Sequence, residues 1–168
     1  MNDMTLVNIF LGAPEGLEEE RQAFHDAVGD VNEAEGLKRG VLFVPLFVSR
    51  KLHEQAVIDS NIRSCTYYIL AVDDYLGSLG RSFEYDLNLA VRYRANAELP
   101  MREVVVLLKQ PAEDRSLESD VAAFRAHPVR EGEPRRIEFA DAPQFKTVVR
   151  DLLQGWICDL TSAPGWAS

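Results

Sequence analysis

The chain has 168 residues, of which 46% are hydrophobic and 27% charged, a composition that fits one globular domain and excludes extensive disorder. Its formal net charge is −9, and such a field repels phosphate backbones, so nucleic acid is not expected as a partner. No apolar run reaches the roughly 18 residues of a membrane span, and the N-terminus lacks a signal-peptide pattern. We therefore expect a cytoplasmic protein that does not bind a membrane.

In chain order, apolar periodicity predicts an alternation of strands and helices. Strands are expected at residues 6–11, 41–48, 66–72, 103–109 and 136–139, and helices at residues 17–35, 51–63, 82–97, 117–126 and 143–159. Pro45 interrupts the second strand, which indicates a bulge or an edge position. The third and fourth strands are nearly continuous apolar runs, as expected of strands covered on both faces.

This alternation predicts an α/β fold with a parallel sheet of about five strands, helices on both faces and right-handed crossovers. Residues 1–160 are expected to form a single domain, and residues 161–168 a flexible tail. The sequence leaves open whether this is a complete protein or one domain of a longer one.

Cysteine and histidine give no sign of a metal site. Cys65 and Cys158 are far apart in apolar surroundings, so we expect two small buried thiols. His25, His53 and His127 lie in different helical segments at no metal-ligand spacing, and we interpret them as structural or surface residues.

The turn after the first strand, Gly12-Ala13-Pro14-Glu15-Gly16, occupies the position where nucleotide-binding folds hold phosphate. It matches neither GxGxxG nor GxxxxGK[ST], and the glutamates at positions 18–20 would oppose a pyrophosphate. Its backbone amides remain suited to a neutral ribose or base, which makes Gly12 a candidate substrate contact.

The junction after the third strand carries the candidate catalytic residue, Glu84. With Ser82 as N-cap, Glu84 is the second residue of a helix, beside the strand's carboxyl end and near Asp73 and Asp74. An acid there stabilises a helix by about 0.3–1 kcal/mol without any catalytic role. Alternatively, a carboxylate in this crevice stabilises or attacks an oxocarbenium-like ribosyl centre during N-glycosidic cleavage.

Two tyrosines flank the same junction. Tyr75 and Tyr85 offer ring faces and hydroxyls suited to a base and a sugar, and Asp73 or Asp74 would hold sugar hydroxyls. Together with Ser82 and Gly12, these residues form the predicted substrate-binding set. No metal is expected in it.

Three segments carry a family resemblance: VNIFLGAPEGLEEERQAF, AVIDSNIRSCTYYILAV and DDYLGSLGRSFEYDLNLAV. With Glu19-Glu20-Arg21 in the first and Ser82-Phe83-Glu84-Tyr85 in the third, the chain resembles, over residues 6–128, a bacterial family of TIR-like domains. It departs from the family pattern at Gly12-Ala13, where hydroxyl residues are common, and at Thr66, where Asp is common.

The resemblance implies kinship to Toll/interleukin-1 receptor domains and nucleoside 2-deoxyribosyltransferases, and hence a flavodoxin-like three-layer sandwich. In those enzymes a glutamate matched by Glu84 acts on the anomeric carbon, as nucleophile toward nucleosides or in support of nicotinamide loss from NAD. We therefore expect a TIR-like signalling or interaction domain that self-associates through helix faces. The alternative is an N-glycosidase or glycosyltransferase, with NAD or a nucleoside as substrate and no cofactor.

Overall fold

The structure, a computed structural model, describes residues 4–46, 54–74, 83–113, 116–128 and 130–163. The strands are β1 (Thr5–Gly12), β2 (Val41–Leu46), β3 (Tyr67–Val72), β4 (Glu103–Lys109) and β5 (Arg135–Phe139). The helices are α1 (Glu18–Val31), α2 (Gln55–Ser64), α3 (Phe83–Arg94), α4 (Ser119–Ala126) and α5 (Ala142–Ser162). A π turn, η1 (Asn32–Gly36), and a 3₁₀ turn, η2 (Leu37–Arg39), follow α1.

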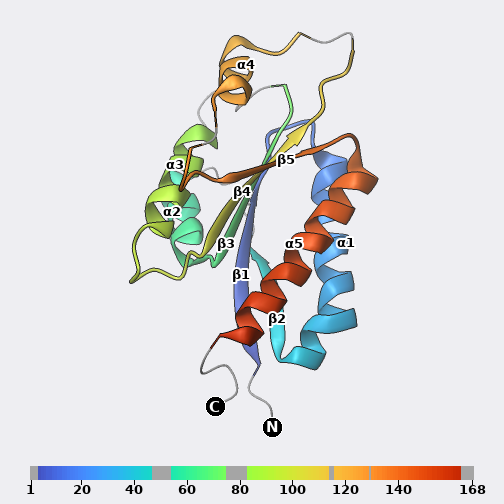
Figure 1. The fold of residues 1–168 in the computed structure, drawn as a ribbon, viewed down its shortest axis with the longest axis vertical. Coiled ribbons are helices and arrows are strands. Elements are labelled where there is room, and N and C mark those ends of the chain that lie inside the picture. The colour runs from blue at the N-terminus through green and yellow to red at the C-terminus, as the bar shows by residue number, and fades with distance from the viewer. Residues whose placement is uncertain (1–3, 47–53, 75–82, 114–115, 129, 164–168) are drawn as a thin grey trace.

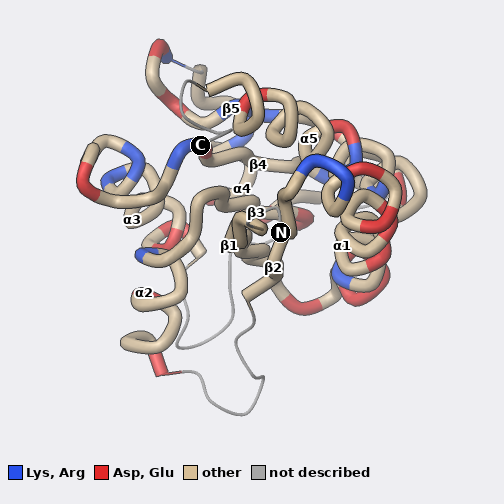
Figure 2. Tube along the Cα trace, turned by 90° about the horizontal axis from the view of Figure 1, so that it is seen from below, with Lys and Arg blue, Asp and Glu red and all other residues tan. Residues whose placement is uncertain are grey.

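The strands form one sheet in the order β2-β1-β3-β4-β5, and every neighbouring pair is parallel (Figure 1). Helices α1 and α5 cover one face, and α2 and α3 cover the other (Figure 2). This strand order is that of flavodoxin-like doubly wound sheets. The predicted α/β three-layer sandwich with five parallel strands is confirmed.

Two hydrophobic cores lie on the two faces of the sheet. All six residues of β3 are buried, and they alternate: the odd-numbered ones pack with α1 and α5, and the even-numbered ones with α2 and α3. A strand buried on both faces needs a continuous apolar run, and this is why β3 and β4 were recognisable in the sequence.

Helix α5 is anchored to the sheet by Trp156. Its ring stacks on Tyr67 with centroids 4.0 Å apart, and its Nε1 donates to the Glu103 carboxylate at 2.5 Å. Glu103 also pairs with Arg135 at 2.9 Å. Burial raises the pKa of Tyr67 to about 12, so its hydroxyl stays protonated across the physiological range.

At the outer edge of the sheet, one side chain pairs with the backbone of Phe43 in β2. The Asn32 amide donates to the Phe43 carbonyl at 3.0 Å and accepts from the Phe43 N–H at 2.9 Å. In a parallel edge strand, the N–H and C=O groups of every second residue point away from the neighbouring strand. Pro45 lies two residues after Phe43, so its nitrogen also points away from β1 and no hydrogen bond between the strands is lost. Gly36 of η1 allows the turn to pack closely against β2, since a Cβ at this position would lie 2.7 Å from the Val41 carbonyl oxygen.

The predicted elements are all present, with shifts at their ends. The helix predicted at residues 17–35 is α-helical only to Val31, because η1 takes over where Asn32 bonds to β2. The last helix continues to Ser162, so residues 161 and 162 of the predicted tail are helical, while residues 164–168 lie outside the described part.

The start of β1 and the end of α5 lie at the same end of the sheet, opposite the carboxyl ends of the strands (Figure 1). Within the described ranges, no helix combines the length and apolar character needed to cross a membrane.

We expect Asn32→Ala to lower the free energy of unfolding by about 1–3 kcal/mol, because it leaves the outward N–H and C=O of Phe43 without their partner. Urea unfolding measures this as a lower midpoint at unchanged slope. Gln22→Ala on the exposed face of α1 is the control. Equal midpoints for the two variants would contradict the edge-closing role.

Candidate functional site

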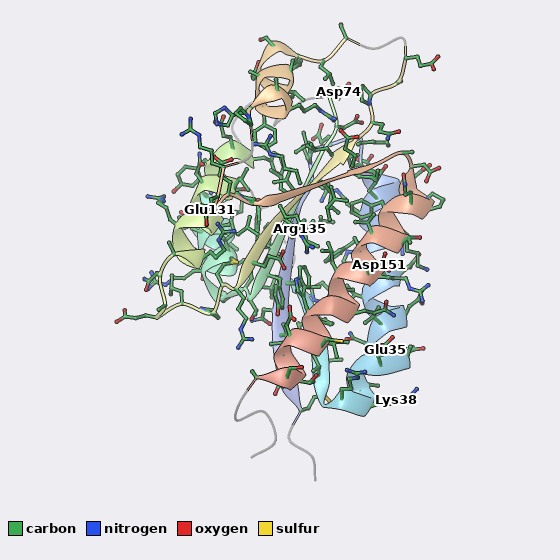
Figure 3. The ribbon with its side chains drawn as sticks, viewed as in Figure 1. Glu35, Lys38, Asp74, Glu131, Arg135 and Asp151 are labelled. Carbon is green, nitrogen blue, oxygen red and sulfur yellow. The ribbon has the colours of Figure 1, made fainter. Side chains whose placement is uncertain are left out.

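The strand order reverses between β1 and β3, so the crevice at their carboxyl ends is the expected ligand position in this fold. Gly12 ends β1, and Asp73 and Asp74 directly follow β3. The structure thus brings three of the predicted substrate-binding residues to one end of the sheet. Figure 3 shows Asp74 there, at the end opposite Glu35 and Lys38.

Gly12 is required by packing. A Cβ at this position would lie 2.8 Å from the Tyr68 hydroxyl oxygen, closer than side chains tolerate. The Tyr68 ring is buried and stacks on Phe10 with centroids 5.6 Å apart. The glycine therefore makes room for a core tyrosine, and this accounts for its place whether or not a ligand contacts it.

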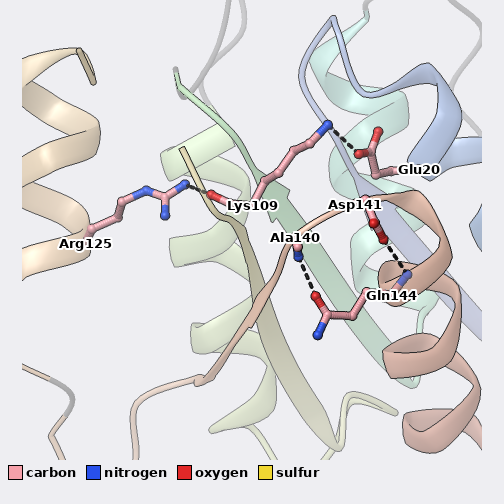
Figure 4. Close-up of polar contacts among 6 residues, drawn as sticks. All are labelled: Glu20, Lys109, Arg125, Ala140, Asp141 and Gln144. Atoms are coloured by element: carbon pink, nitrogen blue, oxygen red, sulfur yellow. Dashed lines mark hydrogen bonds and ion pairs between the residues drawn. The ribbon is translucent and has the colours of Figure 1, made fainter. Parts of the chain in front are cut away.

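The ends of β3 and β4 are tied together by Arg125 of α4. Its Nη2 donates to the backbone carbonyl of Asp73 at 3.0 Å and to that of Lys109 at 2.5 Å. Figure 4 draws the bond to Lys109. Burial lowers the pKa of this guanidinium. Arg125 is therefore committed to holding α4 against the sheet.

A second tie crosses the other face of the sheet. Glu20, in the first turn of α1, is 1% exposed, and its carboxylate lies 2.6 Å from the Nζ of Lys109 (Figure 4). The sequence showed Glu20 only as one of three acids at a helix start, so this pair was missed. The sequence did contain one indication of this pair: Lys109 ends a buried strand, and a charge in that position needs a partner of opposite sign.

Glu84 is exposed, as the second residue of α3. Its side chain lines a groove of about 580 Å³ between α3 and α4, whose floor includes Leu87, Val106 and Phe124. The volume falls within the roughly 300–1,000 Å³ typical of ligand pockets. The structure thus places the predicted catalytic residue in a concave site, but on its accessible rim.

Tyr85 points away from this groove. It is 44% exposed, and its hydroxyl donates to Asp59 of α2 at 3.3 Å. The Asp59 carboxylate raises the pKa of Tyr85. Consecutive helix residues face different directions, so Glu84 faces the groove beside α4 and Tyr85 contacts α2.

A polar seam between α2 and α3 was not foreseen. Asp86 is fully buried, and the amide of Gln55 donates both to it, at 3.1 Å, and to Asp59, at 2.7 Å. The seam fixes α3 beside α2 and thereby sets which side of α3 faces the groove. The other predicted site residues, Tyr75 and Ser82, lie outside the described residues, as does His53.

The two cysteines differ. Cys65 is buried as predicted, and burial raises the pKa of its thiol to about 12. The prediction for Cys158 is wrong: it is exposed, because it lies off the buried stripe of α5. No group of three or more metal-ligating side chains occurs among the residues that the structure describes.

Comparisons with known proteins bear on the fold alone. No protein-family model matches the sequence, and no curated protein is significantly similar to it. A rubredoxin oxygen:oxidoreductase from Desulfovibrio gigas is similar in structure, with a TM-score of 0.50 and 12% identity over 96% of this chain. This chain spans 38% of that protein's length. A flavodoxin-like domain from Synechococcus gives a TM-score of 0.43 and 14% identity, covering 90% of this chain and 99% of that domain.

The fold is flavodoxin-like, and flavodoxin itself holds FMN at the β1/β3 crevice of a sheet of this order. The first turn here does not fit its phosphate. Pro14 has no N–H, and the Gly16 N–H donates to the Glu18 carboxylate at 3.3 Å. Arg21 donates to the carbonyls of Ala13 and Pro14. The Glu18 carboxylate therefore accepts a hydrogen bond from the Gly16 N–H, a donor that a phosphate in this turn would otherwise use.

We expect flavin mononucleotide not to bind, since the acids of the first α1 turn oppose its phosphate. Titration of the flavin with excess protein, followed by flavin fluorescence, tests this. Saturable quenching would show that the turn accommodates an anion after all.

Lys109→Met is expected to lower the free energy of unfolding by about 2–4 kcal/mol, because it leaves the buried Glu20 carboxylate without the positive charge that faces it. Adding Glu20→Gln should recover much of that loss in a double-mutant cycle. The control, Lys146→Met, removes the exposed pair with Asp30 and should cost less than about 1 kcal/mol. Equal losses for the two lysine variants in urea unfolding would refute the buried pair's role.

Proposed function

We propose that this protein is a TIR-like interaction domain that binds a partner in the groove between α3 and α4, rather than an enzyme. The supporting observation is the arrangement at the start of α3. Glu84 stands exposed on the groove rim, whereas Tyr85 is engaged with Asp59 on the opposite side of the helix. Glu84 and Tyr85 therefore do not share one pocket, and Tyr75, the other predicted aromatic partner, lies outside the described residues.

A catalytic carboxylate acts through a substrate held against it and neighbours fixed in advance. Glu84 instead occupies the second position of a helix, where an acid complements the helix dipole. Glu19 occupies the same position in α1 and is also exposed, so such a residue needs no catalytic explanation.

N-glycosidic cleavage is the second candidate, because Glu84 does line a groove of ligand size. In that case its carboxylate would stabilise or attack the ribosyl centre, with Asp73 or Asp74 near the sugar hydroxyls. The groove charges favour an uncharged nucleoside over NAD, since Glu84, Asp120 and Glu133 all line the groove and would repel a pyrophosphate. Self-association through helix faces, expected from the resemblance, stays a prediction.

The two candidates differ in one assay. Purified protein at high concentration is incubated with NAD and with a panel of nucleosides, and base release is followed by chromatography. We expect no release from any substrate.

Turnover that Glu84→Gln abolishes would overturn the proposal and support the glycosidase. The matched control is Glu19→Gln, at the same position of another helix. Each variant should lose about 0.3–1 kcal/mol of stability through the helix dipole, so folding does not distinguish them.

A further inference from the structure

The α3–α4 groove has an apolar floor built from two helices and a strand. Leu87 and Val91 come from α3, Val106 from β4, and Ala123 and Phe124 from α4. Ala123 is exposed, and Val91 and Phe124 are only partly buried, so this floor is accessible. Apolar surface at a concave site favours an occupant with apolar side chains.

The charged groups around this floor are mostly acidic. Carboxylates come from Glu84 on α3, Asp120 on α4 and Glu133 before β5. Asp120 accepts from the hydroxyl of Ser119, and Glu133 from the backbone N–H of Arg130. Neither bond neutralises a negative charge.

Among the described residues that line the groove, Arg136 is the one Lys or Arg side chain, and its guanidinium bonds to the protein itself. Its Nη1 donates to the carbonyls of Phe124 and His127, each at 2.9 Å. Its Cζ lies 4.8 Å from the centroid of the Phe124 ring. This guanidinium secures the end of α4 and keeps its positive charge, so three carboxylates against one guanidinium leave the described lining with a net charge of −2.

The groove length follows from helical geometry. Lining residues recur at i, i+3, i+4 and i+7, from Glu84 to Val91 on α3 and from Asp120 on α4 to His127, the residue that directly follows α4. Seven residues of helix span about 10 Å, the length of about two helical turns of an incoming segment. Two facing helices with an apolar floor are the arrangement that receives an amphipathic segment.

We propose that the α3–α4 groove binds a cationic amphipathic segment of a partner protein, with apolar side chains on the floor and Lys or Arg side chains facing Glu84 and Asp120. This deepens the proposed function and rests on it. The acidic rim selects the sign of the partner's charge, and the apolar floor supplies the contact area.

A phage-displayed random dodecapeptide library, panned on the whole protein, tests this without presuming a partner. Enriched peptides should combine apolar residues with Lys or Arg. In fluorescence anisotropy, a synthetic copy should bind at least about tenfold more weakly to Ala123→Arg, which obstructs the floor and adds a like charge. Ala122→Arg is the matched control, exposed on the same helix but outside the groove lining, and should bind as the parent does.

The charge term is measured separately. The double variant Glu84→Gln and Asp120→Asn should weaken binding by about twofold to thirtyfold, the sum of two exposed ion pairs. Binding should also weaken as salt approaches about 1 M, where the Debye length is about 3 Å.

Other outcomes overturn the inference in distinguishable ways. Enriched acidic or uncharged peptides that still lose binding to Ala123→Arg would refute the cationic partner and keep the groove as an interaction site. Peptides bound equally by both arginine variants, or no enrichment, would overturn the groove and with it the proposed function. A dimer that Ala123→Arg dissociates in sedimentation would make a second copy the occupant and refute the peptide partner.

Discussion

The parallel arrangement of all five strands is the constraint on which the rest of this molecule depends. Each crossover returns the chain to the same end of the sheet, so the helices begin at the carboxyl ends of the strands. Acids favour helix starts, and the first turns of α1, α3 and α4 carry them. One end of the protein therefore collects carboxylates as a consequence of topology.

That end also limits the chemistry open to the protein. Lys109 neutralises Glu20, while Arg21 and Arg125 are bound to backbone carbonyls. These cations hold the loops and α4 in place instead of offering themselves to an anionic ligand. The same fold carries nucleotides and flavins elsewhere, and these contacts support our proposal of a neutral or cationic partner here.

The fold could be predicted from the sequence because each of its elements has a local sequence pattern. A buried strand such as β4 is a continuous apolar run, and its predicted limits agree with the structure. The candidate site was harder, because it depends on side-chain pairs distant in sequence. Glu84 was placed correctly at its helix start, but the turn of Tyr85 toward Asp59 depends on how α2 packs against α3. The groove also depends on the position of α4, which Arg125 ties to the ends of β3 and β4 and Arg136 ties to β5, and no periodicity encodes these contacts.

The bidentate amide of Asn32 has a consequence for the solution behaviour of the protein. An unpaired edge strand is a template for intermolecular β-sheet growth, and at Phe43 of β2 the Asn32 amide occupies that template. A strand from another molecule would have to displace η1 before it could pair there. Resistance to aggregation on this side should therefore follow the local opening of η1 from β2, which can occur long before the domain as a whole unfolds.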